Sequence, residues 1–197
     1  MLALPPHSEE DAGVFWGTGA AGAGTVDRGY RELFLKQRSR ISPLSVVQGM
    51  HNAAASHIAL RLGLGGPCLS YSVACASSAI AIGEAFLRIQ QGQLALAVAG
   101  GGEAVLPYGS LKAWESMQII APAALGGGAC RPFHAERAGL VLGEGAAALV
   151  LEDWERAQAR GAVIYAEVLG YASTCDHHHL TSPDSRGQVR AMQQALR

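Results

Sequence analysis

Short apolar runs alternate with amphipathic ones along almost the whole chain, and this alternation restricts the fold more than any other feature of the sequence. Strand-like runs are predicted at residues 12–17, 68–74, 94–101, 143–152 and 163–173, and helical periodicity at 26–37, 45–63, 78–91 and 153–160. Glycines lie mostly at the junctions, where short turns are needed. Strands that alternate with helices favour an α/β layered fold with buried sheets.

Composition narrows the class of protein further. With 197 residues, 49% of them hydrophobic, and a formal net charge of −1, the chain can bury a core and carries no charge excess that would favour nucleic acid. No apolar run approaches the ~20 residues that span a bilayer, and the first residues lack the features of a secretion signal. We therefore expect a cytoplasmic protein without a membrane partner. The four cysteines form no C-x-x-C pair, so free thiols are expected.

Cys75 lies where a predicted strand meets a predicted helix, in the stretch SYSVACASSAIAIGEAFLRIQQG. A thiol there faces the positive end of the helix dipole, and unpaired N–H groups of the first turn would favour the thiolate and hold an oxyanion. Ser77 or Ser78 is expected to cap the helix. Buried cysteines are more often inert filler than nucleophiles, so both interpretations stay open on this local pattern.

The stretch GTGAAG at residues 17–22 matches G-x-G-x-x-G after a short strand, which is the dinucleotide-binding pattern. That pattern also calls for an acidic residue at the end of a second strand about 20 residues later. No acidic residue follows Glu32 in the corresponding region. A plain turn between strand and helix is therefore the preferred interpretation.

The stretch CDHHHL at residues 175–180 contains imidazole and thiolate groups that zinc binds well. Adjacent side chains of an extended segment point to opposite sides, so His177 and His179 could converge, with Cys175, but three consecutive histidines could not. No second cluster of ligands is evident in the sequence. A loop histidine near a reaction centre is the preferred interpretation.

Five segments together resemble one family, the β-ketoacyl-acyl-carrier-protein synthases, which are condensing enzymes of the thiolase-like fold. The resemblance rests on VFWGTGAAG (14–22), RISPLSVVQGMHNAAASHIALRLGLGGPC (40–68), SVACASSAIAIGEAFLRIQQGQLALAVAGGGEA (72–104), CRPFHAERAGLVLGEGAAALVLEDWERAQARGAVIYAEVLGY (130–171) and STCDHHHLTSPDSRG (173–187). Their order and spacing are similar to those of the family from about residue 12 onward.

The resemblance implies a thiolase-like layered α/β fold, incomplete here, with mixed sheets and buried helices. Residues 1–161 would form part of the N-terminal ketoacyl synthase half, and residues 162–197 the start of the C-terminal half. It also implies that Cys75 is the nucleophile, that Met50 lines an acyl pocket, and that Asp176, His179 and Thr181 belong to a mobile substrate-binding loop.

The implied reaction is acyl transfer from an acyl-carrier-protein thioester to Cys75, followed by decarboxylative condensation with malonyl-carrier protein in fatty-acid or polyketide synthesis. No metal or other cofactor is implied. The family forms dimers, so we expect a homodimer that pairs through residues 69–74.

The sequence departs from the family in its histidines. The family uses two histidines from motifs of the H-G-T and K-x-x-x-G-H types, and none of the seven histidines here has either context. We therefore expect the isolated chain to perform little or no condensation. Two alternatives remain: a non-catalytic scaffold subunit or truncated remnant, and a dinucleotide-dependent oxidoreductase built on GTGAAG.

Overall fold

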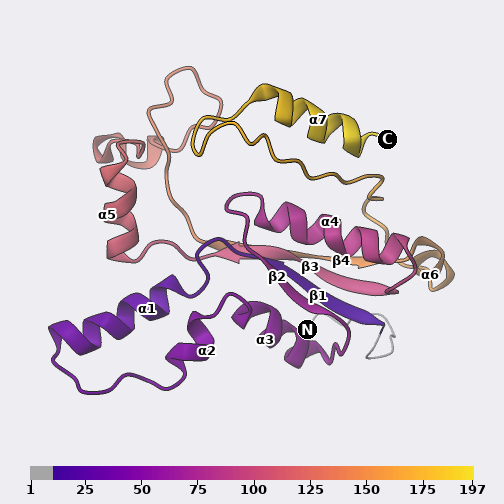
Figure 1. Cartoon of the computed structure of the whole chain (residues 1–197), viewed down its shortest axis with the longest axis horizontal. Helices are drawn as coiled ribbons and strands as arrows, with labels where there is room; N and C mark the ends of the chain where they lie inside the picture. Colours follow the sequence, from indigo (N-terminus) through magenta and orange to yellow (C-terminus); the bar gives the residue numbers. More distant parts are fainter. Residues whose placement is uncertain (1–10) are drawn as a thin grey trace. The chain divides into compact units, whose positions relative to one another are not determined.

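The computed structural model describes residues 11–197 (Figure 1). These residues form four strands, β1 (Ala12–Gly17), β2 (Cys68–Tyr71), β3 (Leu96–Glu103) and β4 (Gly145–Glu152). The α-helices are α1 (Ala23–Tyr30), α2 (Ser45–Gly49), α3 (Ala53–Leu62), α4 (Ser77–Gln90), α5 (Tyr108–Ser116), α6 (Trp154–Ala159) and α7 (Ser185–Ala195). A π-helix, η1 (Arg31–Leu35), follows α1, and a 3-10 helix, η2 (Ala123–Gly128), follows α5.

The four strands form one mixed sheet in the order β2-β1-β3-β4. β1 pairs in parallel with β2 and with β3, so that Val14 lies between Cys68 and Val98. β4 is antiparallel to β3. The N–H of Asp153, just after the end of β4, donates to the carbonyl of Ala95, just before the start of β3, at 3.1 Å. The mixed sheet predicted for the chain is confirmed.

The chain divides into two structural units. Unit 1 comprises residues 11–19, Ala54–Gly101 and Ala147–Arg197, and unit 2 comprises Ala20–Ala53 and Gly102–Ala146. The hydrophobic clusters lie in unit 1, on the two faces of β1 and β3.

Helices cover both faces of the central strands of unit 1 (Figure 1). On one face Val14 and Trp16 pack in a cluster that includes Ala55, with Ile58 of α3 against it. On the other face Phe15 packs in a cluster with Ala81 and Ala85 of α4. Alternate residues of a strand point to opposite faces, so β1, buried along its whole length, supplies both clusters. This layering is the α/β fold expected from the alternation of elements.

The strand predicted at residues 163–173 is wrong, because the structure assigns no strand there. Val163 and Tyr165 are 79% and 96% exposed, and no strand among residues 11–197 pairs with this segment. A strand requires hydrogen bonds from a neighbour, so an apolar, β-branched sequence without a partner remains irregular.

The single helix predicted at residues 45–63 is also wrong, because the structure forms α2 and α3 with a break between them. Met50 adopts an extended conformation with ψ 148° and ends α2. The backbone of Gln48 and Gly49 lies directly against Gly22, where any side chain on residue 22 would overlap it. The helix expected at 26–37 begins earlier and ends as a π-helix, giving α1 and η1.

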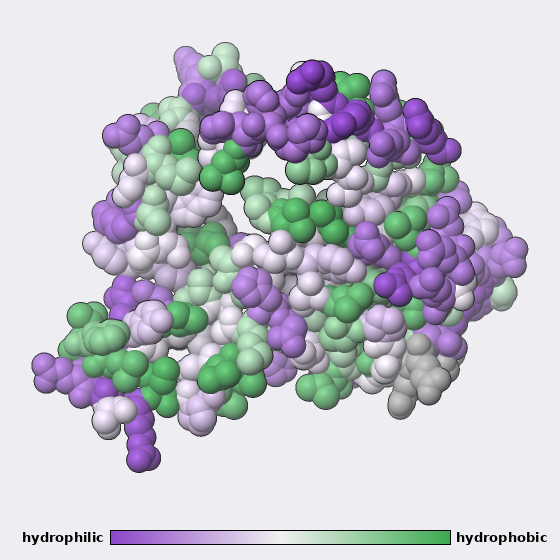
Figure 2. Space-filling model, viewed as in Figure 1, coloured by the Kyte–Doolittle hydropathy of each residue, from purple (hydrophilic) through white to green (hydrophobic). Residues whose placement is uncertain are grey.

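Unit 2 exposes much apolar surface. Figure 2 shows hydrophobic side chains, in green, over α1 and α2, and Phe34 and Leu35 of η1 are each 73% exposed. Two carboxylates hold loops of the unit: Glu103 accepts from the N–H of Ala20 at 3.0 Å and Glu144 from that of Leu106 at 3.0 Å. No helix within residues 11–197 has the length and apolar character needed to cross a bilayer.

Candidate active site

Cys75 lies on a tight turn that joins β2 to α4, which confirms the predicted seam between strand and helix. We call residues 73–78 the Cys75 turn. The N–H of Ala76 donates to the carbonyl of Val73 at 3.0 Å, and that of Ser77 to the carbonyl of Ala74 at 3.2 Å. Ala74 has a φ of +47°, a conformation that costs a non-glycine residue of order 1–2 kcal/mol. The thiol of Cys75 is exposed, so it does not serve as core filler.

The hydroxyl of Ser77 stabilises the Cys75 turn through two hydrogen bonds. Its Oγ accepts from the N–H of Val73 at 2.8 Å and donates to the carbonyl of Ala74 at 2.7 Å. Ser77 itself is 3% exposed, and both bonds are partly buried. The expected serine cap of α4 is wrong: the N-cap is Ala76 and no side chain caps the helix, because the Ser77 hydroxyl is already used by the turn.

Two glycines of the neighbouring strands make room for this turn. A Cβ at Gly17 would overlap the carbonyl of Ser77 and the N of Ser78, and one at Gly101 would overlap the Ser78 hydroxyl. Gly17 ends β1 and Gly101 lies near the end of β3, so the start of α4 rests on the bare backbone of both. The first glycine of GTGAAG is thus needed for packing beneath the Cys75 turn.

The turn places the Cys75 sulfur near the N-terminus of the 14-residue helix α4. The helix dipole favours negative charge there, such as the oxyanion of an attacked carbonyl. The N–H groups of Ala76 and Ser77, however, are occupied by Val73 and Ala74. The sequence predicted several free N–H groups in this turn, and for the N–H groups of Ala76 and Ser77 that prediction is wrong.

The other thiols differ from Cys75 in their settings. Cys68, Cys130 and Cys175 are exposed and unpaired. Partial burial of Cys68 on β2 raises the pKa of its thiol, which disfavours the thiolate at neutral pH. None of the three precedes a helix as Cys75 does.

The second predicted site segment is an exposed loop of unit 1, residues 176–184, which we call the His179 loop. The Asp176 carboxylate closes its base by accepting from the N–H of Asp184 at 2.9 Å and of His178 at 3.3 Å. These bonds lower the pKa of Asp176. At the tip, His179 Nδ1 accepts from the N–H of Thr181 at 3.1 Å. Asp176, His179 and Thr181 thus belong to one loop, with Asp176 engaged by backbone.

Both ends of the His179 loop are attached to α7. Asp184 caps α7 by accepting from the N–H of Arg186 at 2.9 Å. Gly187, in the first turn of the helix, leaves space for Asp176: a Cβ there would lie 2.5 Å from the Asp176 Cβ. The Arg190 guanidinium donates to the carbonyl of Cys175 at 3.0 Å.

Met50, the remaining predicted site residue, lies at the end of α2 in unit 2 and is 46% exposed. Among residues 11–197 no group of three or more histidine, cysteine or carboxylate side chains is arranged to hold a metal ion. The consecutive histidines of the CDHHHL stretch therefore form no such cluster.

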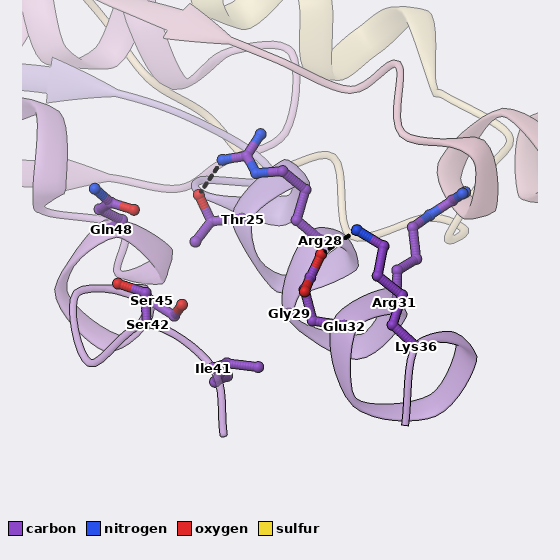
Figure 3. A pocket seen from close by; sticks show the side chains of 10 residues that line it. All are labelled: Thr25, Arg28, Gly29, Arg31, Glu32, Lys36, Ile41, Ser42, Ser45 and Gln48. Carbon is purple, nitrogen blue, oxygen red and sulfur yellow. Dashed lines mark hydrogen bonds and ion pairs between the residues drawn. The ribbon is translucent and has the colours of Figure 1, made fainter. Parts of the chain in front are cut away.

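A cavity of about 510 Å³ lies in unit 2 between α1–η1 and the segment that leads into α2 (Figure 3). Its lining includes Arg28, which donates to the Thr25 hydroxyl at 3.1 Å, and the Lys36–Glu32 ion pair. None of the predicted site residues lines it. The cavity lining therefore shares no residue with the candidate site at Cys75.

The sequence suggested Ser77 as a cap of α4 and did not predict that its hydroxyl supports the Cys75 turn. The signal was present in the spacing, since a serine two positions after a cysteine at a strand end can reach back to the turn. Its hydrogen bonds became evident only from the folded turn.

Residues 3–157 match the family described as "Beta-ketoacyl synthase, N-terminal domain". The chain is 39% identical to nodulation protein E of Rhizobium leguminosarum bv. trifolii over 184 residues, covering 93% of this chain and 45% of that protein. It is 36% identical to 3-oxoacyl-[acyl-carrier-protein] synthase 2 of Staphylococcus aureus over 198 residues, covering 100% of this chain and 49% of that protein. The chain thus spans about half the length of these curated relatives.

Two solved structures of ketosynthases also resemble this chain in fold. A beta-ketoacyl synthase from Burkholderia phymatum STM815 superposes with a TM-score of 0.84 at 35% identity, covering 96% of this chain and 46% of that one. The AntDE:AntF complex, a type II PKS acyl-carrier protein with its ketosynthase bound to the hexaketide, superposes with a TM-score of 0.87 at 28% identity, covering 98% and 51%.

Proposed function

Because the chain belongs to the beta-ketoacyl synthase family, we propose that it is part of a 3-oxoacyl-[acyl-carrier-protein] synthase-like condensing enzyme with Cys75 as its nucleophile. The observation that carries the proposal is the position of Cys75. Its thiol is exposed on a strained turn at the N-terminus of α4, with a fixed backbone beneath it. Exposure and a helix N-terminus are the conditions under which a cysteine attacks a carbonyl.

The first step is acyl transfer. The Cys75 thiolate attacks the carbonyl carbon of an acyl thioester on the carrier protein and forms a new C–S bond. The C–S bond to the carrier then breaks, and the carrier leaves as a thiolate that takes up a proton. The positive end of α4 favours the oxyanion of the intermediate.

The second step is condensation. A malonyl-carrier thioester loses carbon dioxide, and the resulting carbanion attacks the acyl group on Cys75. The product is a 3-oxoacyl thioester two carbons longer, and the Cys75 thiolate is released. No histidine here has the sequence context that the family uses for this step. We therefore propose that this chain alone becomes acylated without completing condensation.

The remaining site residues are proposed to meet the substrate. Met50 would line the acyl pocket, and the His179 loop, with Asp176, His179 and Thr181, would border the entrance. The exposure of His179 and Thr181 at the loop tip supports this assignment. Residues 1–161 are proposed as part of the N-terminal half of the enzyme and residues 162–197 as the start of the C-terminal half, and a family match that stops at residue 157 supports the division.

The proposed partner is an acyl carrier protein that delivers acyl and malonyl thioesters in the cytoplasm. Support comes from the AntDE:AntF complex, which contains an acyl-carrier protein with its ketosynthase. Fatty-acid and polyketide synthesis both use this chemistry, and the relatives include a 3-oxoacyl synthase and a type II PKS ketosynthase.

A homodimer through β2 is also proposed. β2 is an edge strand of the sheet among residues 11–197. The carbonyls of Pro67 and Tyr71 bond to β1, through the N–H groups of Val14 and Thr18. Because backbone groups alternate in direction along a strand, those of Cys68 and Ser70 face the open edge. An open edge is a template for a second strand.

A proline at Ser70 would remove one outward N–H without touching the bonds to β1. We expect Ser70→Pro to be monomeric by sedimentation while the unsubstituted chain is dimeric. A Ser70→Pro chain that remains dimeric would show that the pair forms elsewhere.

The test of the catalytic proposal is intact mass after incubation with an acyl thioester or an epoxide electrophile. We expect one adduct, absent from Cys75→Ala and retained in Cys130→Ala, which removes an exposed thiol outside the site. If the folded chain acquires no adduct, the scaffold or remnant interpretation is favoured.

A further inference from the structure

We propose that Ser77 is a positioning residue whose hydroxyl clamps the Cys75 turn and thereby presents the Cys75 sulfur to a substrate. This inference rests on the proposed role of Cys75 as nucleophile. Ser77 touches neither substrate nor reacting atoms; it acts through the backbone that carries Cys75.

The clamp is built from two short hydrogen bonds to the backbone that directly precedes Cys75. The Ser77 Oγ accepts from the N–H of Val73 and donates to the carbonyl of Ala74, at 2.8 and 2.7 Å. The two bonds use both the donor and an acceptor site of one hydroxyl. They connect the first residue of α4 to the two residues that precede Cys75, so the turn cannot open without breaking both.

The turn needs such a clamp because its geometry is strained. Ala74 holds φ at +47°, where an L-residue with a side chain is disfavoured. A conformation of this kind persists only where its surroundings enforce it. Here the enforcing groups are the buried Ser77 hydroxyl and the backbone of Gly17, against which Ser77 rests.

The burial of Ser77 determines what the loss of its hydroxyl would do. Ser77 is 3% exposed, and removing its hydroxyl leaves the Val73 N–H without its protein partner. The Cys75 side chain above remains exposed. The loss therefore acts on the direction of the sulfur and leaves its access to reagents open.

The neighbouring serine provides a matched control. Ser78 differs from Ser77 by one position on α4 and contacts the strand end at Gly101. Its hydroxyl makes neither of the two bonds of the clamp. Ser78→Ala removes the same atom as Ser77→Ala while the clamp remains.

The experiment measures the rate and pH profile of Cys75 alkylation by iodoacetamide, read at peptide level by mass spectrometry, with Cys130 of the same chain as internal reference. We expect Ser77→Ala to slow Cys75 relative to Cys130 by about tenfold, since the sulfur is then no longer held at the N-terminus of α4, the setting that makes a cysteine reactive. Ser78→Ala should leave the ratio unchanged. An unchanged ratio in Ser77→Ala would overturn the proposal.

A second substitution separates clamping from simple space filling. Glycine adopts positive φ without strain, so Ala74→Gly lowers the need for a clamp. We expect Ala74→Gly to restore part of the rate lost in Ser77→Ala. If the double variant is as slow as Ser77→Ala alone, the hydroxyl does not act by holding the turn.

Amide exchange of the unsubstituted chain keeps the test decisive if Ser77→Ala does not fold. The Val73 N–H should exchange slowly, although it belongs to no strand, and fast exchange would contradict the clamp. Alkylation needs no acyl thioester. If the chain is not acylated but Ser77→Ala slows alkylation, the proposed function is contradicted and the clamp is supported. If the chain is acylated but Ser77→Ala has no effect on alkylation, the function is supported and the clamp is contradicted.

Discussion

The Cys75 turn and the His179 loop both present a reactive side chain to solvent, but they are held in different ways. The Cys75 turn rests on backbone: Ser77 and Ser78 lie directly on Gly17 and Gly101, and a buried hydroxyl ties the turn together. The His179 loop is held by the Asp176 carboxylate, bonded to the N–H groups of His178 and Asp184.

The difference predicts different mechanical behaviour. Contacts between backbones cannot rearrange without moving strands of the core, so the Cys75 turn should stay fixed. The base of the His179 loop depends on two hydrogen bonds to one carboxylate near the surface, so it should open more readily when that group is protonated or displaced. The Cys75 turn is thus expected to be rigid and the His179 loop adjustable.

Gly17→Ala is expected to have the largest effect, and it tests whether the Cys75 turn is rigid. The new Cβ would overlap the carbonyl of Ser77 and the N of Ser78, and neither atom belongs to a flexible side chain. We expect the free energy of unfolding to fall by about 3 kcal/mol in urea titrations. Gly145→Ala, in β4 with no atom within 4 Å of the new Cβ, is the control. A loss below about 1 kcal/mol for Gly17→Ala would show that the turn yields.

Gly187→Ala tests the His179 loop from the side of α7. The new Cβ would lie 2.5 Å from the Asp176 Cβ, so the loop base must shift. Because alanine also favours the helix by up to about 1 kcal/mol, we expect a small net change in stability but much faster proteolysis within residues 176–184.

Gly109→Ala in α5 is its control, since only Asp27 Oδ1, at 4.0 Å, lies near that Cβ. It should bring the helix benefit without the proteolysis. Equal proteolysis of both variants would mean that Asp176 does not hold the loop.

Acid should open the His179 loop before it affects the Cys75 turn. Hydrogen bonds from the Asp184 and His178 N–H groups lower the pKa of Asp176, and the Arg186 side chain and N–H lower that of Asp184. For carboxylates with lowered pKa values, the stabilisation is complete above the ordinary value of 3.8 and is lost as pH falls through the lower, folded values.

Amide exchange of His178 and Asp184 at stepped pH measures this opening. We expect protection to be constant above pH 4 and to disappear below it, while the Val73 N–H stays protected longer. Asp176→Asn should remove the dependence at these two amides. Protection that persists to the pH of global unfolding would contradict the mechanism.

Tyr171→Phe should have the smallest effect. The Tyr171 ring packs over Gly83 of α4, and its hydroxyl reaches Glu84 Oε1 only at 3.5 Å, the limit of a hydrogen bond. We expect unfolding to change by less than about 0.5 kcal/mol, because ring packing remains. A larger loss, measured by urea titration, would show that the hydroxyl anchors the segment before the His179 loop.

The layered architecture and the position of Cys75, the proposed nucleophile, could be predicted from the sequence alone. β1, β3 and α4 follow from the apolar alternation and periodicity of their own residues, and Cys75 is placed by the elements on either side of it. The family resemblance followed from the order of motifs, which the match to residues 3–157 confirms. These features depend on residues that are close together in the chain, so the sequence alone predicts them.

Tertiary structure decided what depends on distant partners. Residues 163–173 have the composition of a strand, but no neighbour among residues 11–197 pairs with them. Residues 45–63 have one helical period, but the approach of Gln48 to Gly22 accompanies a break at Met50. Gly17 must lack a side chain because Ser77, sixty residues later, lies against it. Hydrogen-bond partners and backbone approach are properties of the folded chain, so only the structure could supply them.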